Sequence, residues 1–350
     1  MLANLLFSLE HTMPLFALMV LGYLLRQGRF FGERFVADAN KLVFHVALPV
    51  LLFLDMADMD LRASFDPAYV GFCAAATLAS ILGVWGLAHL LLRDKTQIGE
   101  FVQGSYRSSA AILGVAFVQL IYGDAGTSGL MILGSVPLYN IFAVLILALE
   151  NPARYAARAS GGAATAANPT GDAASVEKAS GGAASALAAP PLSETLRRTV
   201  VKILTNPIIL GLAAGFLWSL LRLPVPEVMG DTLQMIANLT TPLALLAIGA
   251  GFQGREALGE AKLTAAAAAI KLLVLPALFL PLAVSLGFRG EAVVSLLVML
   301  GSITTPASYV MARQMGHKGT LTGSVCMATT LFSPLTLTFW LFLADMLHWL

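Results

Sequence analysis

Ten stretches of about twenty or more mostly apolar residues restrict the fold of this chain more than any other feature of its sequence. They cover residues 4–25, 37–57, 67–92, 98–122, 127–149, 200–222, 228–252, 262–287, 292–313 and 320–347. A helix needs about 20 such residues to cross the hydrocarbon core of a bilayer. Lipid offers backbone groups no hydrogen-bonding partner, so spanning segments form helices or closed barrels. The lengths predict an all-α membrane protein with ten transmembrane helices.

The composition agrees with a membrane protein and argues against several other classes. Hydrophobic residues make up 58% of the 350 residues and charged residues only 12%, against about 25% charged residues in soluble proteins. A net charge of +1 gives no basic excess for nucleic acid, so we expect no nucleic-acid partner. Zinc-protease, serine-hydrolase and phosphate-loop motifs are absent from the sequence, as are His/Cys metal spacings. We therefore expect neither an enzyme nor a bound cofactor.

The positions of Lys and Arg predict the orientation in the membrane. If the N-terminus lies outside, 16 of the 21 basic residues fall in inner loops and three in outer loops. The other two, Arg107 and Lys271, fall inside predicted spans. Basic residues concentrate on the cytosolic side of membrane proteins. We therefore expect a multi-pass protein of a bacterial-type inner (plasma) membrane, with both termini outside.

A low-complexity segment divides the chain into two halves of five spans. Residues 150–199 contain "ASGGAA" twice, at 159–164 and 179–184, and offer almost no large apolar residue for a core, which predicts a flexible cytosolic linker. The first repeat would be residues 1–149 and the second residues 200–350. Because each half has an odd number of spans, the halves must be inverted relative to each other.

Short matches between the halves support this 5+5 inverted repeat. "GSYRSSAA" begins at 104 and "GSITTPAS" at 301, and the same offset of 197 relates Pro137 to Pro334. Pro49 and Pro242 are related by an offset of 193. Inverted repeats with interrupted helices in corresponding positions are typical of secondary transporters, which bind substrate near the bilayer midplane.

Several segments resemble the auxin efflux carrier family, which includes plant auxin exporters and bacterial permeases for malate and malonate. They are "FVQGSYRSSAAILGVAFVQLIYG", "PLYNIFAVLILALE", "ILTNPIILGLAAGFLWSLL" and "TPLALLAIGAGF". The resemblance implies a fold related to bile-acid and sodium/proton carriers, in which helices four and nine are broken and cross near the midplane. Helices one, two, six and seven would form a scaffold, against which the others move. Where the family often has Asn and Pro in helix four, this chain has Ser109 and Ala116.

The two cations inside predicted spans are the strongest candidates for function. A charged side chain at the centre of a membrane helix costs about 2.5–3.5 kcal/mol on insertion scales. Arg107 would repay this cost by binding a substrate carboxylate, or alternatively would extend its side chain to the inner interface. Lys271 would take part in coupling or replace a bound cation, or alternatively would hold a fixed structural partner.

Polar residues around the expected breaks complete the predicted substrate site. They are Ser108, Ser109, Asn140, Thr304, Thr305, Pro306, Ser308 and Tyr309. The alternative for each is to join neighbouring helices by hydrogen bonds. Glu10 and His45 are further candidates for coupling, and their alternative role is to anchor helix ends at the interface. Gly211 and Gly215 predict close helix packing within the scaffold.

The sequence thus favours a secondary transporter of small organic anions that works by alternating access. Two buried cations favour a dicarboxylate, and the resemblance names malate and malonate. The coupling ion, H⁺ or Na⁺, stays open. Alternatives are an auxin-like exporter of monocarboxylates, a membrane-embedded ligand sensor and a membrane enzyme. The partners would be the organic anion and the lipid bilayer, with a homodimer through the scaffold helices as a further possibility.

Overall fold

The part of the chain that the computed structural model describes is helical apart from its connections and one isolated bridge between two extended residues. It comprises residues 2–57, 66–110, 117–119, 121–122, 127–153, 155, 201 and 205–350. Most of the predicted linker, 150–199, lies outside these residues. The helices are α1 Leu2–Gln27, α2 Glu33–Leu42, α3 Leu48–Ala57, α4 Pro67–Leu91, α5 Ile98–Tyr106, α7 Ser128–Leu149, α10 Pro207–Leu221, α11 Glu227–Asn238, α12 Thr240–Gly251, α13 Gly254–Gly259, α14 Ala261–Ala269, α15 Leu275–Ser285, α16 Glu291–Gly301, α17 Ala307–Gln314 and α18 Thr320–Met346.

Six helices are long and apolar enough to cross a membrane: Glu33–Ala57, Pro67–Leu91, Ser128–Leu149, Glu227–Gly251, Ala261–Ser285 and Thr320–Met346. Their bounds lie close to the predicted spans. Two other spans are interrupted, as the resemblance implies. The predicted 98–122 helix stops at Tyr106, and the predicted 292–313 helix divides into α16 and α17. The bounds of α1 also agree closely with the first predicted span.

Proline explains a local widening in two of the long helices. The π-helical turns η1, Val43–Ala47, and η3, Ile270–Val274, end just before Pro49 and Pro276. A proline ring clashes with the carbonyl four residues earlier and cannot donate to it, and a π turn is one way to absorb this. The carbonyl four residues before Pro276 belongs to Leu272, and it accepts a hydrogen bond of 3.0 Å from the Trp340 indole. A neighbouring helix thus supplies the lost partner.

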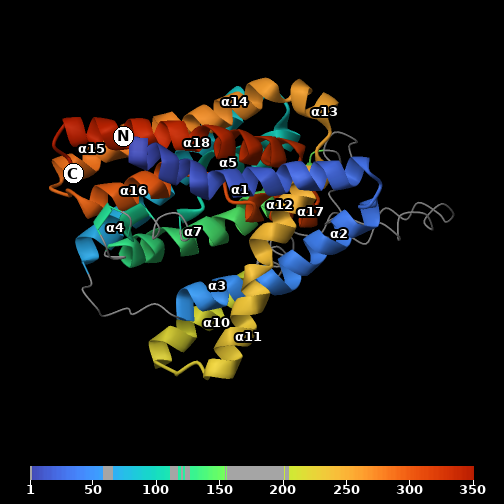
Figure 1. The fold of residues 1–350 in the computed structure, drawn as a ribbon, viewed down its shortest axis with the longest axis horizontal. Coiled ribbons are helices and arrows are strands. Elements are labelled where there is room, and N and C mark those ends of the chain that lie inside the picture. Colours follow the sequence, from blue (N-terminus) through green and yellow to red (C-terminus); the bar gives the residue numbers. More distant parts are fainter. Residues whose placement is uncertain are drawn as a thin grey trace, which may run out of the picture.

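The helices form two groups, which we call the arm group and the bundle group. The arm group contains α1, α2, η1, α3, α10, α11 and α12, with α1 packed along α12 and α3 along α10. The bundle group contains α4, α5, α7, η3 and α14–α18. In Figure 1, α3, α10 and α11 project from one side, whereas the bundle group surrounds α5. The predicted scaffold helices are those that pack together in the arm group.

Glycine lets the arm helices touch backbone to backbone. A Cβ on Gly211 would lie 2.4 Å from the carbonyl oxygen of Pro49, and one on Gly215 would lie 2.3 Å from that of Phe53. A Cβ on Gly249 would lie 1.9 Å from the carbonyl oxygen of Met19. The predicted close packing at Gly211 and Gly215 is confirmed, and its partner is α3. The arm group is therefore closely packed in a way that suits a rigid scaffold.

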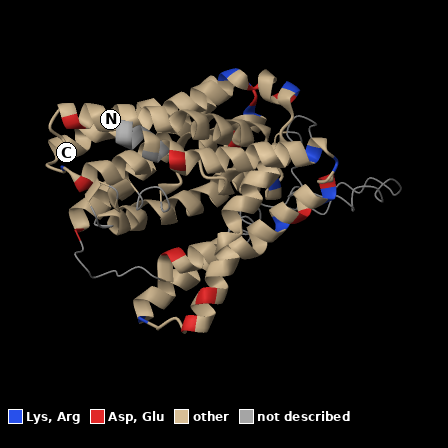
Figure 2. Ribbon diagram, in the orientation of Figure 1, with Lys and Arg blue, Asp and Glu red and all other residues tan. Residues whose placement is uncertain are grey.

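Charge divides the molecule along its long axis. The two chain ends lie together at one end of the molecule (Figure 1). Most Lys and Arg lie toward the opposite end, around the α1–α2 turn, α13 and the start of α14 (Figure 2). This separation agrees with the loops predicted to share one side of the membrane.

Candidate functional site

Two broken helices meet at the centre of the candidate site. α5 ends at Tyr106 and α16 ends at Gly301, and a short non-helical segment follows each helix. Ser108 and Thr304 form an isolated antiparallel bridge between these segments, and the Ser109 N–H donates to the Ile303 carbonyl at 3.0 Å. We call residues 107–109 the first break and residues 302–306 the second break. The bridge holds them against each other.

Side chains satisfy the backbone groups that the breaks release. The Thr304 hydroxyl donates to the Gly104 carbonyl in the last turn of α5 at 2.8 Å. The Thr304 N–H donates to the Thr329 hydroxyl of α18 at 3.0 Å. Carbonyls in the last turn of a helix have no partner within the helix. The Thr304 side chain thus satisfies the end of α5 before the first break, and the Thr329 side chain satisfies a backbone N–H of the second break.

Lys271 projects from η3 onto the end of α5. Its ammonium donates to the Ser108 hydroxyl at 2.5 Å and to the Tyr106 carbonyl at 3.3 Å, and its side chain is fully buried. A cation at a helix C-terminus is favourable because the carbonyls there carry partial negative charge. The π turn places Lys271 next to the first break. The structure therefore unites two residues, Lys271 and Ser108, that are 163 positions apart.

Arg107 is the first residue after α5 and is also buried, at 3% exposure. Its Nη2 donates to Oδ1 of Asn140 on α7 at 2.6 Å, and its Nη1 lies 2.6 Å from the sulfur of Met311 on α17. Asn140 is itself oriented by a 2.9 Å hydrogen bond to the Val136 carbonyl. Arg107 is therefore buried in the protein and points toward α7 and α17.

The two cations contact different neighbours on the two sides of the first break. Successive side chains of an extended segment point to opposite faces. Accordingly, Ser108 faces Lys271, whereas Arg107 faces α7 and α17. Neither cation is within ion-pair distance of an acidic group among the described residues. Within the part of the chain that the structure describes, the interior thus holds two cations without a fixed anionic partner.

Several buried polar atoms near the breaks have no hydrogen-bond partner within the described residues. They include the hydroxyls of Ser302 and Ser308 and the side-chain oxygen of Gln103. A buried polar group without a partner costs free energy, so native proteins usually supply one. These three residues therefore have unused hydrogen-bonding capacity near the breaks.

A polar cavity of about 690 Å³ leads into the protein between the arm and bundle groups. Three cations line it, Arg26, Arg313 and Lys318, together with Glu33 and Glu256. Tyr309 of α17 also lines it, two residues before the Met311 that contacts Arg107. The cavity is therefore polar, holds more cations than anions and reaches α17, the helix that follows the second break.

The predicted site residues fall into two sets. Arg107, Ser108, Ser109, Asn140, Thr304, Thr305, Pro306, Ser308, Tyr309 and Lys271 belong to the breaks or to the helices next to them. Pro306 is the N-cap of α17, while Ser109 and Thr305 are partly exposed. Glu10 and His45 are exposed on α1 and η1, and His45 contacts the Lys41 carbonyl of its own helix. The structure does not bring these two residues to the breaks.

Sequence reasoning missed four residues that complete the site: Gln103, Tyr106, Tyr139 and Ser302. The Tyr106 hydroxyl donates to the Tyr139 carbonyl at 3.3 Å, and the Tyr139 hydroxyl donates to the Met299 carbonyl at 3.0 Å. These contacts tie α5, α7 and α16 together beside the breaks. The available signal was that Tyr106 and Ser302 belong to the two matching motifs and that Gln103 directly precedes the first of them.

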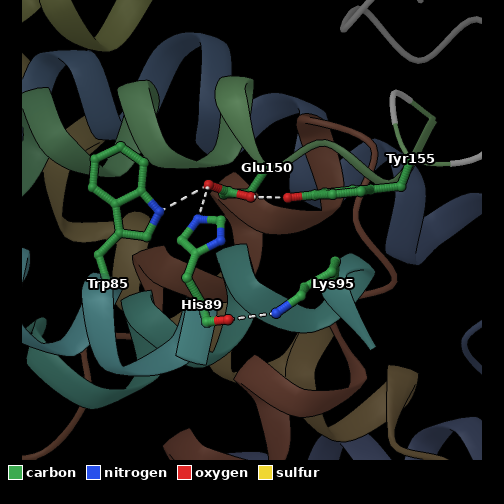
Figure 3. Close-up of polar contacts among 5 residues, drawn as sticks. All are labelled: Trp85, His89, Lys95, Glu150 and Tyr155. Carbon is green, nitrogen blue, oxygen red and sulfur yellow. Dashed lines mark hydrogen bonds and ion pairs between the residues drawn. The ribbon is translucent and has the colours of Figure 1, made fainter. Parts of the chain in front are cut away.

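A second polar cluster lies at the end of α7, where the chain leaves the first half. Figure 3 shows the Glu150 carboxylate between the indole of Trp85, the imidazole of His89 and the hydroxyl of Tyr155. Burial acts to raise the pKa of Glu150, but the hydrogen bonds from Tyr155, Trp85 and His89 outweigh it and lower the pKa. Glu150 is thus a fully bonded carboxylate that joins α4 to the start of the following segment.

Two further carboxyl groups lie near the polar cavity. Glu100 accepts hydrogen bonds from the Gly319 N–H at 2.8 Å and from the Thr322 N–H at 3.1 Å, at the start of α18. Glu260 lies between α13 and α14, and one of its oxygens is buried without a partner among the described residues. Burial, followed by the negative charge of Glu100, raises the pKa of Glu260 to about 7. Glu100 is therefore a helix cap, whereas Glu260 can bind a proton near neutral pH.

A comparison with protein families identifies the kind of protein. A family model described as a membrane transport protein matches residues 7–341. The match covers both halves of the chain and both breaks. No curated protein sequence matches the chain.

Proposed function

The chain belongs to the auxin efflux carrier family of membrane transport proteins, and from this premise we propose that it is a secondary active transporter of small organic anions. The anion would bind at the first break, on the face that carries Arg107 and Asn140. Ser308 and the second break would complete the site. Family membership supplies the class of activity, and the arrangement of charge in the breaks supports the choice of an anion.

One observation carries this proposal: the buried cation Arg107 has polar and sulfur contacts but no acidic partner within the described residues. A buried charge is strongly unfavourable unless it is paired. A carboxylate matches the planar fork of a guanidinium with two parallel hydrogen bonds. A mobile anion is the partner that satisfies Arg107 for part of a transport cycle.

We assign Lys271 a role in coupling. Its ammonium lies where a transported cation would find ligands, on a carbonyl at the end of α5 and on the Ser108 hydroxyl. A fixed ammonium takes the place of a metal cation there, and it can exchange a proton. We therefore propose coupling to H⁺ instead of Na⁺.

The proposed mechanism is alternating access in a ten-helix, 5+5 inverted repeat. The close glycine contacts support the arm group as the stationary part. The polar cavity lies between the two groups and is lined mainly at the end rich in Lys and Arg, which is the cytosolic end in the proposed orientation. With this orientation, the polar cavity opens to the cytosol in the conformation described here. A homodimer through the arm helices is part of the same proposal.

The choice among anions rests on the resemblance more than on the geometry. Lys271 contacts the opposite face of the break from Arg107, so the two cations do not form one clamp. A second carboxylate would instead meet the cations of the cavity, Arg313 and Lys318. Malate and malonate are therefore the first substrates to test, and an auxin-like monocarboxylate is the alternative.

Uptake into proteoliposomes tests the proposal. Purified protein is reconstituted and offered radiolabelled malate, malonate and monocarboxylates under imposed H⁺ or Na⁺ gradients. We expect uptake of at least one carboxylate, stimulated by the H⁺ gradient and lost in Arg107→Ala. Arg34→Ala removes an exposed cation and serves as the matched control. Uptake that survives Arg107→Ala, or an absence of carboxylate uptake in the wild type, would overturn the proposal.

A further inference from the structure

A second cavity of about 630 Å³ runs along the outside of the bundle group and is almost entirely apolar. We call it the lateral groove. Its walls are α14, η3 and α18, and it is closed on the arm side by Phe16 of α1 and Phe252 after α12. Among the described residues none that lines it is charged, and the polar side chains in that lining are Thr264, Ser324 and Thr336. The groove suits a hydrocarbon ligand and not the anion proposed above.

Alanine in α14 creates the groove. Ala261, Ala265, Ala268 and Ala269 line one wall, opposite Met327, Ala328 and Leu331 of α18. Larger side chains at these positions would fill the space. Several residues on the rim are strongly exposed, including Leu258 at 78%, Phe332 at 51% and Leu273 at 44%. In a membrane protein such exposed apolar residues face lipid, so the groove opens sideways into the bilayer.

The length of the groove matches one leaflet. Its lining extends from Ala261 to Leu273 along one wall and from Ser324 to Thr336 along the other. Twelve helical steps correspond to about 18 Å at 1.5 Å per residue. Half of a hydrocarbon core of about 30 Å is about 15 Å. An acyl chain from one leaflet would therefore fit along the groove.

Two basic residues lie at one end of the lateral groove, where a lipid headgroup would be. Arg255 and Lys262 are exposed next to the lining residues Gly254 and Ala261, and neither forms an ion pair within the described residues. Figure 2 shows basic residues at α13 and the start of α14. The acidic neighbours Glu256 and Glu260 accept hydrogen bonds from Thr320 and Gln97. Because burial raises the pKa of Glu260 to about 7, this carboxyl is partly protonated near neutral pH, and the two exposed cations exceed the negative charge that remains. The end of the groove therefore suits an anionic group at the membrane surface.

From this arrangement we propose that the lateral groove binds one anionic phospholipid, with an acyl chain along α14 and α18 and its phosphate on Arg255 and Lys262. The lipid contacts both groups of helices, because Phe16 and Phe252 belong to the arm side and α14 and α18 to the bundle. Its presence therefore favours the relative position of the two groups seen here. This consequence for transport rests on the proposed function, whereas lipid binding does not.

Native mass spectrometry of the purified protein with phosphatidylglycerol or phosphatidylcholine tests the binding. We expect the wild type to retain phosphatidylglycerol in preference to phosphatidylcholine. Ala265→Phe combined with Ala269→Phe fills the groove at two exposed positions, and retention should fall at least about tenfold because several methylene contacts are lost. Ala266→Phe, on an exposed position of α14 that does not line the groove, should retain lipid as the wild type does.

A second pair of substitutions separates the headgroup from the chain. Arg255→Gln with Lys262→Gln should remove the preference for phosphatidylglycerol while leaving weak retention of both lipids. Three results would overturn the proposal: equal retention of the two lipids by the wild type, full retention after the groove is filled, or an unchanged preference in the Gln variant. All these measurements are made without transport, so failure of the lipid proposal and failure of the proposed function are distinguishable.

Discussion

The two breaks share a backbone geometry but differ in chemistry. Each follows a helix end, and they pair as extended segments through Ser108 and Thr304. The first break contains Arg107, contacts Lys271 and has no proline, whereas the second has Pro306 and no charged residue from 302 to 306. The second break is thus built from proline and hydroxyl groups, and the first from hydroxyl groups and cations.

This difference separates what the fold needs from what the proposed transport needs. An interrupted membrane helix must have its free carbonyl and N–H groups satisfied. The hydroxyls of Thr304 and Thr329 do so for the Gly104 carbonyl and the Thr304 N–H with neutral hydrogen bonds. Charge is not required for that purpose. We therefore assign ligand binding and coupling to the cations at the first break, Arg107 and Lys271. Substitutions of these cations should affect transport, whereas substitutions in the second break should affect stability.

The largest effect is expected for Lys271→Met. We expect transport to be lost while the melting temperature falls only modestly, because relief from a buried charge and filling of its space by an apolar residue of similar length offset the lost hydrogen bonds to Ser108 and to the Tyr106 carbonyl. Uptake assays and thermal unfolding in the same detergent measure both quantities. If the melting temperature falls steeply and transport per folded molecule is normal, Lys271 only stabilises the first break.

The next largest effect is expected at Arg107. Arg107→Lys keeps the charge but loses the planar fork, so substrate affinity should fall by about thirtyfold, or ~2 kcal/mol, almost as much as in Arg107→Ala. Ligand-induced thermal shift of the purified variants measures this. Affinity close to that of the wild type in the Lys variant would remove Arg107 from the binding site.

Asn140→Asp also tests whether the substrate binds to Arg107, because it gives Arg107 a fixed acidic partner. It replaces an amide that contacts Arg107 at 2.6 Å with a carboxylate of the same shape. We expect a fixed partner for Arg107 to abolish anion binding without lowering the melting temperature. A variant that binds the substrate normally would contradict the view that the missing anionic partner is the substrate.

A moderate effect, on stability instead of binding, is expected in the second break. Thr304→Val removes the hydrogen bond to the Gly104 carbonyl and leaves that buried carbonyl without its partner, which should lower the free energy of unfolding by about 1–3 kcal/mol. Substrate affinity of the folded fraction should change less than in the Arg107 variants. Chemical denaturation and substrate binding, measured on the same variant, check this. A large loss of affinity with an unchanged free energy of unfolding would show that the two breaks do not differ as we propose.

The smallest effect is expected at Glu260, outside both breaks. Its pKa is raised from an ordinary value of 4.5 to about 7, so the folded state binds a proton more tightly than the unfolded state. The resulting stability is present at low pH and is lost as the pH rises through about 7. Melting temperatures measured from pH 5 to 8.5 should fall across this range in the wild type, and less so in Glu260→Gln. Parallel curves for both proteins would show that Glu260 does not titrate there.

Much of this fold follows from the sequence because apolar length dictates helices in lipid. The bounds of α4, α7 and α18 agree with the predicted spans to within one residue, and the glycines at 211 and 215 identify a close contact. The break after Tyr106 was expected only from the resemblance and the matching motif at 301. No proline marks it, so its exact place depends on tertiary partners such as Lys271 and Thr304.

The candidate site could be predicted only in part, because its contacts also depend on tertiary packing. Arg107 and Lys271 were conspicuous because charge is rare in membrane helices. Their separation onto two faces of the break depends on the extended conformation of residues 107–109, which periodicity does not reveal. Asn140 and Met311 contact Arg107 through packing of α7 and α17, and no spacing along the chain predicts such contacts.

Protection of single cysteines by substrate tests the central claim that the anion binds between the two breaks. Ser109→Cys and Thr305→Cys place one thiol in each break, at partly exposed positions, in a background that lacks Cys73 and Cys326. Arg34→Cys, at an exposed position outside the lining of the polar cavity, is the control. A transported carboxylate should slow modification by a small thiol reagent at 109 and 305 but not at 34. Equal modification rates at 109 and 305 with and without a saturating substrate would contradict the account.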